Sequence, residues 1–290
     1  MTIIGDSAIA IKQAQKLAQA GQIFNGADKV QLNQFFSYLD NLLQAKISTS
    51  NEFELDELKI SSEVNELKRA IFSVFPKEAV DQYNELNNEL VCAVSNNSPS
   101  EVKSLLEQGA NINVNEHSNF HPLIISADRG YKNMTELLIQ NGANIEARDI
   151  IEYTPLMKAV NKGHWDIIKL LIEHGADVNA RGYADRTPLM VAAGRDDENI
   201  IEFLIKHRAN IDVRNKIGET ALHFAARDGH TKVIWKLVQH EANMKIRNKN
   251  GSTPLMVALK KGNKEAAKVL KQNGTYSLLD KIEVWVNSVS

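Results

Sequence analysis

The sequence predicts an all-α fold, a solenoid of about six helix-loop-helix repeats with β-turn tips, preceded by a small N-terminal helical bundle. Five segments align without a gap at a spacing of 33 residues: FHPLIISA, YTPLMKAV, RTPLMVAA, ETALHFAA and STPLMVAL. Leucines recur at the same period, at 123, 156, 189, 222 and 255 and at 105, 138, 171, 204, 237 and 270. A fixed period of this length is typical of stacked repeats, in which each unit buries its apolar face against its neighbours.

Each unit is expected to contain a turn, a helix, a short loop and a second helix. Thr154 and Pro155 suit a helix start, because the threonine oxygen can accept from free amides and proline at the first position loses no hydrogen bond. Small residues follow, which allow close approach of a neighbouring helix. The apolar residues at 167, 168, 170 and 171 then predict an amphipathic second helix.

Glycines are expected to end the second helices in left-handed turns, as at Gly109, Gly142 and Gly175. Arg208 and Glu241 stand at this position in two later units, where positive φ costs a non-glycine residue about 1 kcal/mol. Asp196-Asp197 replaces the Gly-His pair between helices in another unit, which leaves the conformation of that loop open. Before the first unit's second helix, Ser98, Pro99 and Glu101 predict a capping box.

On these motifs the chain resembles the ankyrin-repeat family, most closely in residues 149–181, which carry TPL, a Gly-His pair and GADVNA. The resemblance covers about residues 85–274, and the expected units are 85–115, 116–148, 149–181, 182–214, 215–247 and 248–274. It implies a domain that binds proteins, usually on the concave face formed by turn tips and first helices. Residues 275–290 are expected to form a helix that caps the stack.

Residues 1–84 show no 33-residue repeat and are expected to form helices at about 7–20, 28–46 and 56–75, followed by one at 77–95 that merges into the first repeat. Two interpretations remain open for this segment. It is either an N-terminal cap packed against the first repeat, or a separate module for assembly or for an unrecognised activity.

Composition excludes several classes of protein. The 290 residues are 43% hydrophobic with a net charge of −2, which argues against a dedicated nucleic-acid or anionic-membrane binder. No apolar run approaches the roughly 18 residues of a membrane span, and the first residues lack the features of a signal peptide. One cysteine excludes an internal disulfide. A cytoplasmic protein is therefore expected.

Motifs for catalysis and cofactor binding are not found. The sequence contains no GxxxxGK[ST], GxGxxG, HExxH or GxSxG motif, so we expect no enzyme and no cofactor. Cys92, in LVCAV, is expected to be a buried, inert thiol. His174, His207 and His240 recur at the repeat spacing, but a cationic residue already suits a helix C-terminus, so we expect no metal site.

Two sets of residues predict where a partner binds. One is a row of arginines at the repeat spacing, which would offer guanidinium groups to carboxylates: Arg148, Arg181, Arg214 and Arg247. The other consists of apolar, aromatic or histidine side chains at turn tips, where polar residues are usual: His117, Phe120, Ile150, Ile151, Tyr153, Tyr183 and Ile217. The expected rim contacts are Lys162, Arg186, Arg195 and Arg227.

The function expected from these residues is non-enzymatic binding of a protein or peptide that carries acidic and apolar residues. Asparagine is abundant, at 28 residues, which is typical of an AT-rich genome. The family resemblance therefore also suggests an alternative, a host-directed bacterial effector whose repeats target a partner.

Overall fold

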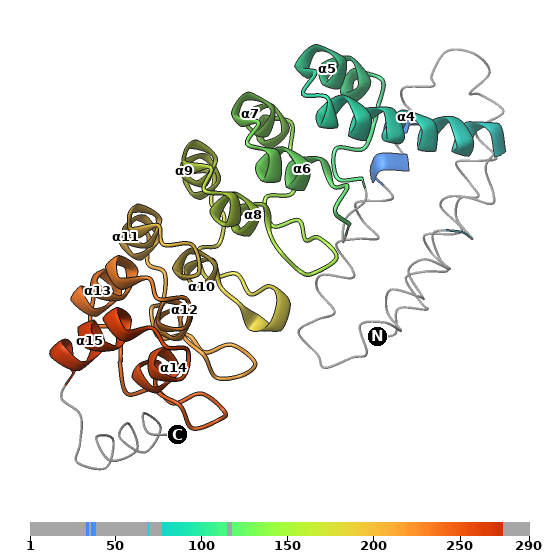
Figure 1. Ribbon diagram of the computed structural model, residues 1–290. Helices are drawn as coiled ribbons and strands as arrows, with labels where there is room; N and C mark the ends of the chain where they lie inside the picture. Colours follow the sequence, from blue (N-terminus) through green and yellow to red (C-terminus); the bar gives the residue numbers. More distant parts are fainter. Residues whose placement is uncertain (1–32, 35, 39–68, 70–76, 115–117, 275–290) are drawn as a thin grey trace. The chain divides into compact units, whose positions relative to one another are not determined.

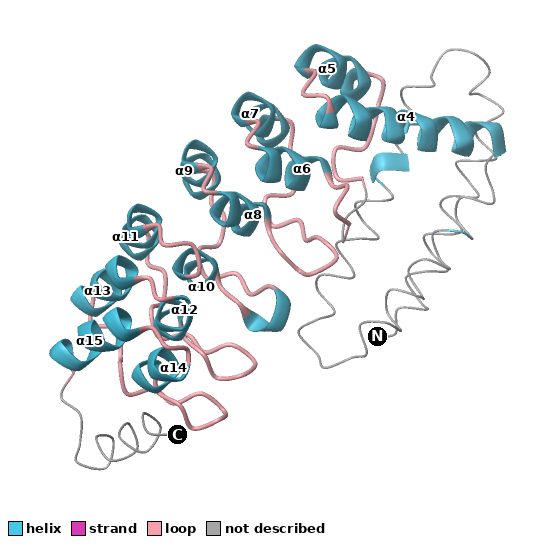
Figure 2. Ribbon diagram, viewed as in Figure 1, coloured by secondary structure: helices cyan, strands magenta, loops and turns pink. Residues whose placement is uncertain are grey.

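The computed structural model describes residues 33–34, 36–38, 69, 77–114 and 118–274 (Figure 1). Regular structure in these ranges is helical, without strands (Figure 2). The chain divides into two compact units: a first of residues 1–116, 120–122 and 140–143, and a second of residues 117–119, 123–139 and 144–290. The paired helices confirm the predicted all-α repeat solenoid.

The first unit contains α4 (Lys77–Ser95) and α5 (Pro99–Glu107), and α4 has the bounds expected from the sequence. The rings of Phe36 and Tyr83 lie 5.2 Å apart, and both side chains are almost fully buried. The Asn33 amide donates a hydrogen bond to the Gln108 carbonyl at 3.0 Å. Residues near 36 therefore pack against this helix pair. The other expected N-terminal helices lie largely outside the described residues.

Two local expectations in this unit are wrong. Ser98 precedes α5 but makes no side-chain capping hydrogen bond, so the capping box is absent. Cys92 is exposed, not buried. On a helix with 100° per residue, Leu90, Ala93 and Val94 share the buried face and Cys92 lies away from it.

The second unit stacks five helix pairs, apart from end residues Pro122 and Gln140, which belong to the first unit. Their first helices form one row in Figure 1 and their second helices another. Along these rows α8, α10, α12 and α14 pack successively, as do α11, α13 and α15. The bounds are α6 (Pro122–Arg129), α7 (Lys132–Gln140), α8 (Pro155–Lys162), α9 (Trp165–Glu173), α10 (Pro188–Ala193), α11 (Glu198–Lys206), α12 (Ala221–Asp228), α13 (Thr231–Gln239), α14 (Pro254–Lys260) and α15 (Lys264–Asn273).

The periodic residues form the core and the helix ends of this stack. Leu171, Leu204 and Leu237 are all 0% exposed, which explains their spacing, because each fills the same place between successive helix pairs. The Thr154 side chain accepts from the Met157 amide at 3.3 Å and so caps α8 as expected. The predicted cap residues 275–290 lie outside the described part of the chain.

The departures from the repeat pattern keep the repeat's geometry. Arg208 and Glu241 have φ of 69° and 63°, which confirms that they adopt the left-handed conformation of the glycines they replace. Asp196, at another glycine position, has φ 60°. Asp197 then caps α11 by accepting from the amides of Asn199 and Ile200. The loop left open by the sequence therefore keeps the left-handed residue of the other units, but α10 ends at Ala193, earlier in its unit than α8 and α12 end in theirs.

Candidate interaction surface

Four tip loops, 148–153, 181–186, 214–219 and 247–252, connect successive helix pairs of the second unit. All four are closed by the same backbone hydrogen bond, for example from the Asn215 amide to the Glu219 carbonyl at 3.0 Å, and three of them, the second loop excepted, are also closed by a side chain. The Asn215 Oδ1 atom also accepts from the amides of Ile217 and Glu219. Asp149 and Asn248 act identically in their own loops, so one side chain organises each of these tips.

Backbone hydrogen bonds join each tip loop to the next. The Tyr183 amide donates to the Ile151 carbonyl at 3.0 Å, the Lys216 amide to Ala184 at 2.9 Å and the Lys249 amide to Ile217 at 2.9 Å. Residues at the same place in the repeat are therefore held in a regular row. We call Ile150, Tyr183, Lys216 and Lys249, which share one repeat position, the tip column.

Apolar side chains project from three of these loops, as the sequence predicts. The exposed fractions are 65% for Ile150, 59% for Tyr183 and 53% for Ile217, and Ile151 is also exposed. Large apolar side chains that are this exposed and in adjacent loops are typical of a protein-binding surface. Phe120 is exposed as well, but it belongs to the first unit, and His117 lies outside the described residues.

The expectation that Tyr153 faces solvent is wrong, because its side chain is 9% exposed. Its ring lies against Gly182, which stands where the other loops have Asp149, Asn215 or Asn248. The loop at Gly182 keeps the backbone closing bond, from the Gly182 amide to the Arg186 carbonyl at 2.9 Å, but forms a short 3-10 turn (Tyr183–Asp185) without the side-chain hydrogen bonds of the other loops. The absence of a side chain at this glycine therefore makes room for the tyrosine.

We predict that Gly182→Ala lowers the free energy of unfolding by about 2 kcal/mol, because an added Cβ would lie 2.8 Å from Tyr153 Cδ1 and 3.1 Å from the Glu152 carbonyl oxygen. Urea unfolding followed by circular dichroism measures this difference. Gly194→Ala is the matched control, since its added Cβ meets nothing closer than 3.6 Å. Equal effects at the two glycines would contradict the steric explanation.

The arginine row has a structural role within the stack. Arg148 Nη1 donates to the Arg181 carbonyl at 2.6 Å, and Arg214 Nη2 donates to the Arg247 carbonyl at 3.0 Å, in each case 33 residues along the chain. Arg148 is also 3.6 Å from Glu152, and Arg181 is 3.8 Å from Asp185. The guanidinium groups of Arg148 and Arg214 therefore link neighbouring tip loops, a contact that the row's periodicity did not predict.

The expected rim residues also make contacts within the stack. Arg195 donates to the Asn161 carbonyl at the end of α8, and Lys162 lies 3.9 Å from Asp128. Arg186 and Arg227 both lie over the ring of Phe224, at 5.0 Å and 4.4 Å from its centroid.

A buried ion pair lies beneath the first of the four tip loops. Asp149 is 0% exposed, and its Oδ2 atom lies 2.7 Å from Lys158 Nζ. Sequence reasoning did not predict this ion pair. The pattern did contain a signal for the true partner, because the other units have Ile125, Val191, Phe224 and Val257 at the position of Lys158.

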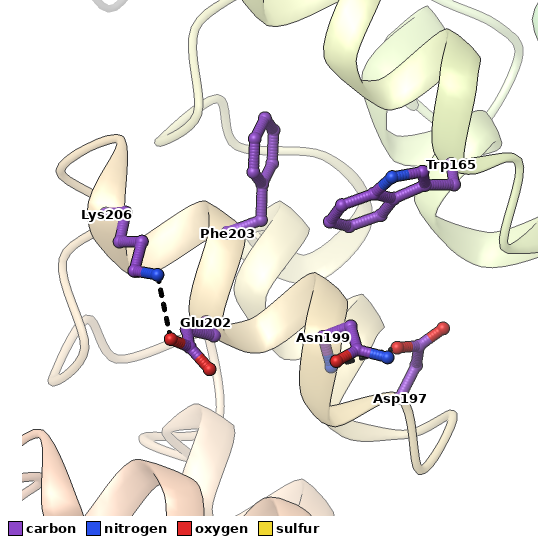
Figure 3. A pocket seen from close by; sticks show the side chains of 6 residues that line it. All are labelled: Trp165, Asp197, Asn199, Glu202, Phe203 and Lys206. Atoms are coloured by element: carbon purple, nitrogen blue, oxygen red, sulfur yellow. Dashed lines mark hydrogen bonds and ion pairs between the residues drawn. The ribbon is translucent and has the colours of Figure 1, made fainter.

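A pocket on the second-helix side has a mixed aromatic and charged lining (Figure 3). Trp165 of α9 packs at 5.0 Å from Phe203 of α11, so this tryptophan is a packing residue. Hydrogen bonds from Lys206 and Lys236 lower the pKa of Glu202 to about 2. The pocket is lined by Trp165, Asp197, Asn199, Glu202, Phe203 and Lys206. Sequence reasoning did not predict it, because its residues come from different units.

Several histidines contact backbone carbonyl groups. The Nδ1 atoms of His174 and His207 each lie 2.8 Å from a carbonyl oxygen four residues earlier, and His164 Nε2 lies 3.0 Å from the Asp128 carbonyl oxygen. In the described ranges no three His, Cys, Asp or Glu side chains are arranged to hold a metal ion. Helices there are also too short or too polar to cross a membrane.

Comparison with known proteins agrees with this architecture. A family model described as ankyrin repeats (3 copies) matches four overlapping segments, residues 69–149, 90–182, 147–215 and 189–280. A search of curated proteins finds no match. The family matches extend over more than half of the chain and include the tip loops and helix pairs described above. The chain belongs to the ankyrin-repeat family.

Proposed function

We propose that the second unit binds a protein or peptide partner through its tip loops and the adjoining first helices, on the concave face usual in this family, and that it does so without catalysis. Ankyrin repeats form protein–protein interaction modules. The observation that supports the location is the exposure of Ile150, Tyr183 and Ile217 in three successive tip loops. Isolated apolar residues on a surface are ordinary, but several of them in adjacent loops favour an interface.

The charges beside this row favour a partner that carries acidic as well as apolar residues. Basic side chains flank the apolar tips, and the chain as a whole has a net charge of only −2, so this positive charge is local. Apolar anchors would supply most of the affinity, whereas charged groups at the edge would orient the partner and speed its encounter.

The test is an affinity capture from lysate that compares the intact chain with the variant Ile150→Ser/Tyr183→Ser/Ile217→Asn. Asn250 occupies the position of Ile217 in the next unit, so asparagine fits this place in the repeat. All three side chains are exposed, and circular dichroism should therefore show an unchanged fold. Each truncated anchor costs about 1 kcal/mol or more, so we expect the variant to bind a captured partner at least roughly a hundredfold more weakly.

Trp235→Ser is the matched control, because this tryptophan is 48% exposed but lies on α13, among the second helices. The proposal predicts that the control retains every partner that the tip variant loses. Loss of a partner by the Trp235 variant, with retention by the tip variant, would place the interface on the second-helix side.

A further inference from the structure

The tip column changes from apolar to basic along the stack. Ile150 and Tyr183 come first, and Lys216 and Lys249 follow, although all four occupy one repeat position. The amides of Tyr183, Lys216 and Lys249 each donate a hydrogen bond to a carbonyl of the preceding loop, which holds these residues in equivalent places. All four side chains are exposed. One continuous row of tips therefore has an apolar half and a basic half.

The carboxylates are distributed in the opposite sense. Loop 148–153 contains two carboxylates and one arginine. Loops 214–219 and 247–252 together contain two arginines and two lysines against one carboxylate, Glu219. That carboxylate is 7% exposed and lies 3.4 Å from Arg227. No acidic side chain in these two loops is therefore left to neutralise the two lysines.

Lys216 and Lys249 are the cations of this row that remain available to a partner. Neither side chain makes a hydrogen bond or an ion pair among the described residues, in contrast to Arg148 and Arg214, whose guanidinium groups donate to backbone carbonyls of the next loop. The basic recognition groups are therefore the two lysines, not the arginine row.

Resting on the proposed function, we infer that the partner segment is an extended peptide with an apolar end over Ile150 and Tyr183 and an acidic end over Lys216 and Lys249. Neighbouring tips are about 10 Å apart, the distance between packed helices. A polyproline II segment has three residues per turn and rises about 9 Å per turn, so every third side chain would face a tip. Two apolar residues and then two carboxylates, three residues apart, match the column.

The test uses fluorescein-labelled 12-residue peptides and the full chain, with binding followed by fluorescence anisotropy. The first peptide has leucine at positions 2 and 5, glutamate at positions 8 and 11, and proline or serine elsewhere. The second has the same composition with leucine at positions 2 and 8 and glutamate at positions 5 and 11. We expect the first to bind about tenfold more tightly, because only its order places leucines and glutamates over their matching halves simultaneously.

The variant Lys216→Glu/Lys249→Glu should weaken binding of the first peptide by about tenfold or more at low salt, because attraction becomes repulsion at two tips. A peptide with lysine in place of both glutamates should instead bind this variant better than it binds the intact chain. Lys232→Glu/Lys268→Glu is the matched control, with the same charge change at exposed positions on α13 and α15, and should leave binding unchanged.

Three results would overturn the inference: equal binding of the two peptides, the same effect from both charge-reversed variants, or no binding of either peptide. A failure of this inference can be distinguished from a failure of the proposed function. If partner capture requires the apolar tips but is unchanged in Lys216→Glu/Lys249→Glu, the proposed interface is supported, and the inference that the partner has an acidic end is wrong.

Discussion

Replacing Lys158 by valine is expected to lower the free energy of unfolding by about 3 kcal/mol. The substitution leaves the carboxylate of Asp149, which is 0% exposed, without its ion-pair partner. An uncompensated buried charge destabilises a protein strongly, even where valine itself fits the site. Valine should fit, because it occupies this repeat position at Val191 and Val257. Urea unfolding at pH 7 gives the difference.

The chain supplies the compensating change. Asparagine replaces Asp149 in two other loops, where its Oδ1 atom accepts the same two amide hydrogen bonds. The double variant Asp149→Asn/Lys158→Val therefore removes both charges and keeps the tip loop closed, and its stability should lie within about 1 kcal/mol of the intact chain. A double variant that is as unstable as Lys158→Val alone would show that packing, and not the unpaired charge, dominates.

His223→Met is expected to reduce the sensitivity of the chain to mild acid. His223 is 0% exposed, and burial lowers its pKa to about 4, opposed by its hydrogen bond to the Ser252 carbonyl and assisted by the charge of Arg214. Since Nε2 donates to that carbonyl, Nδ1 must accept from the Thr220 amide, so the native ring is neutral. Methionine is the matched replacement, present at this repeat position in Met157, Met190 and Met256.

The direction of this pH effect follows from the protons bound by the folded and the unfolded chain. Between pH 6.5 and about pH 4 the unfolded chain binds a proton at His223 that the folded chain does not, so stability is complete above pH 6.5 and falls as the pH decreases. The full loss for this shift is about 3 kcal/mol. His223→Met should be less stable at pH 7.5 by about 1 kcal/mol, because two hydrogen bonds are lost, and the difference should shrink or reverse at pH 4.5. Unfolding curves at both pH values test this, and a constant difference would contradict it.

The parts of the fold that were predicted correctly depend on short-range or strictly repeated features. Thr154 caps α8 because its oxygen and the amide that donates to it are three residues apart. Arg208 adopts positive φ because any residue at the end of that helix must turn the chain in the same direction. Leu171 is buried because every unit places the same leucine between the same helices. Such features are visible in one unit and are confirmed by the next.

The parts that were wrong or missed depend on contacts and side-chain orientations that the repeat pattern does not specify. Tyr153 is buried because a glycine lies opposite it, 29 residues later in the chain. Its position in a tip loop had predicted that its side chain would be exposed. Cys92 was assigned to an apolar run, but the orientation around α4 decides its exposure.

The repeat, the helix pairs, the buried leucines and the exposed apolar tips could all be predicted from the sequence, because stacking imposes the same requirements every 33 residues. Which charged side chains remain available to a partner depends on contacts that appear only in the folded chain. Lys158 meets Asp149, and Arg148 meets a carbonyl 33 residues away, whereas Lys216 and Lys249 meet neither a carboxylate nor a carbonyl in the described chain. The physical reason is distance: ion pairs and side-chain hydrogen bonds need atoms within about 3–4 Å, and a periodic pattern specifies positions, not separations between particular atoms.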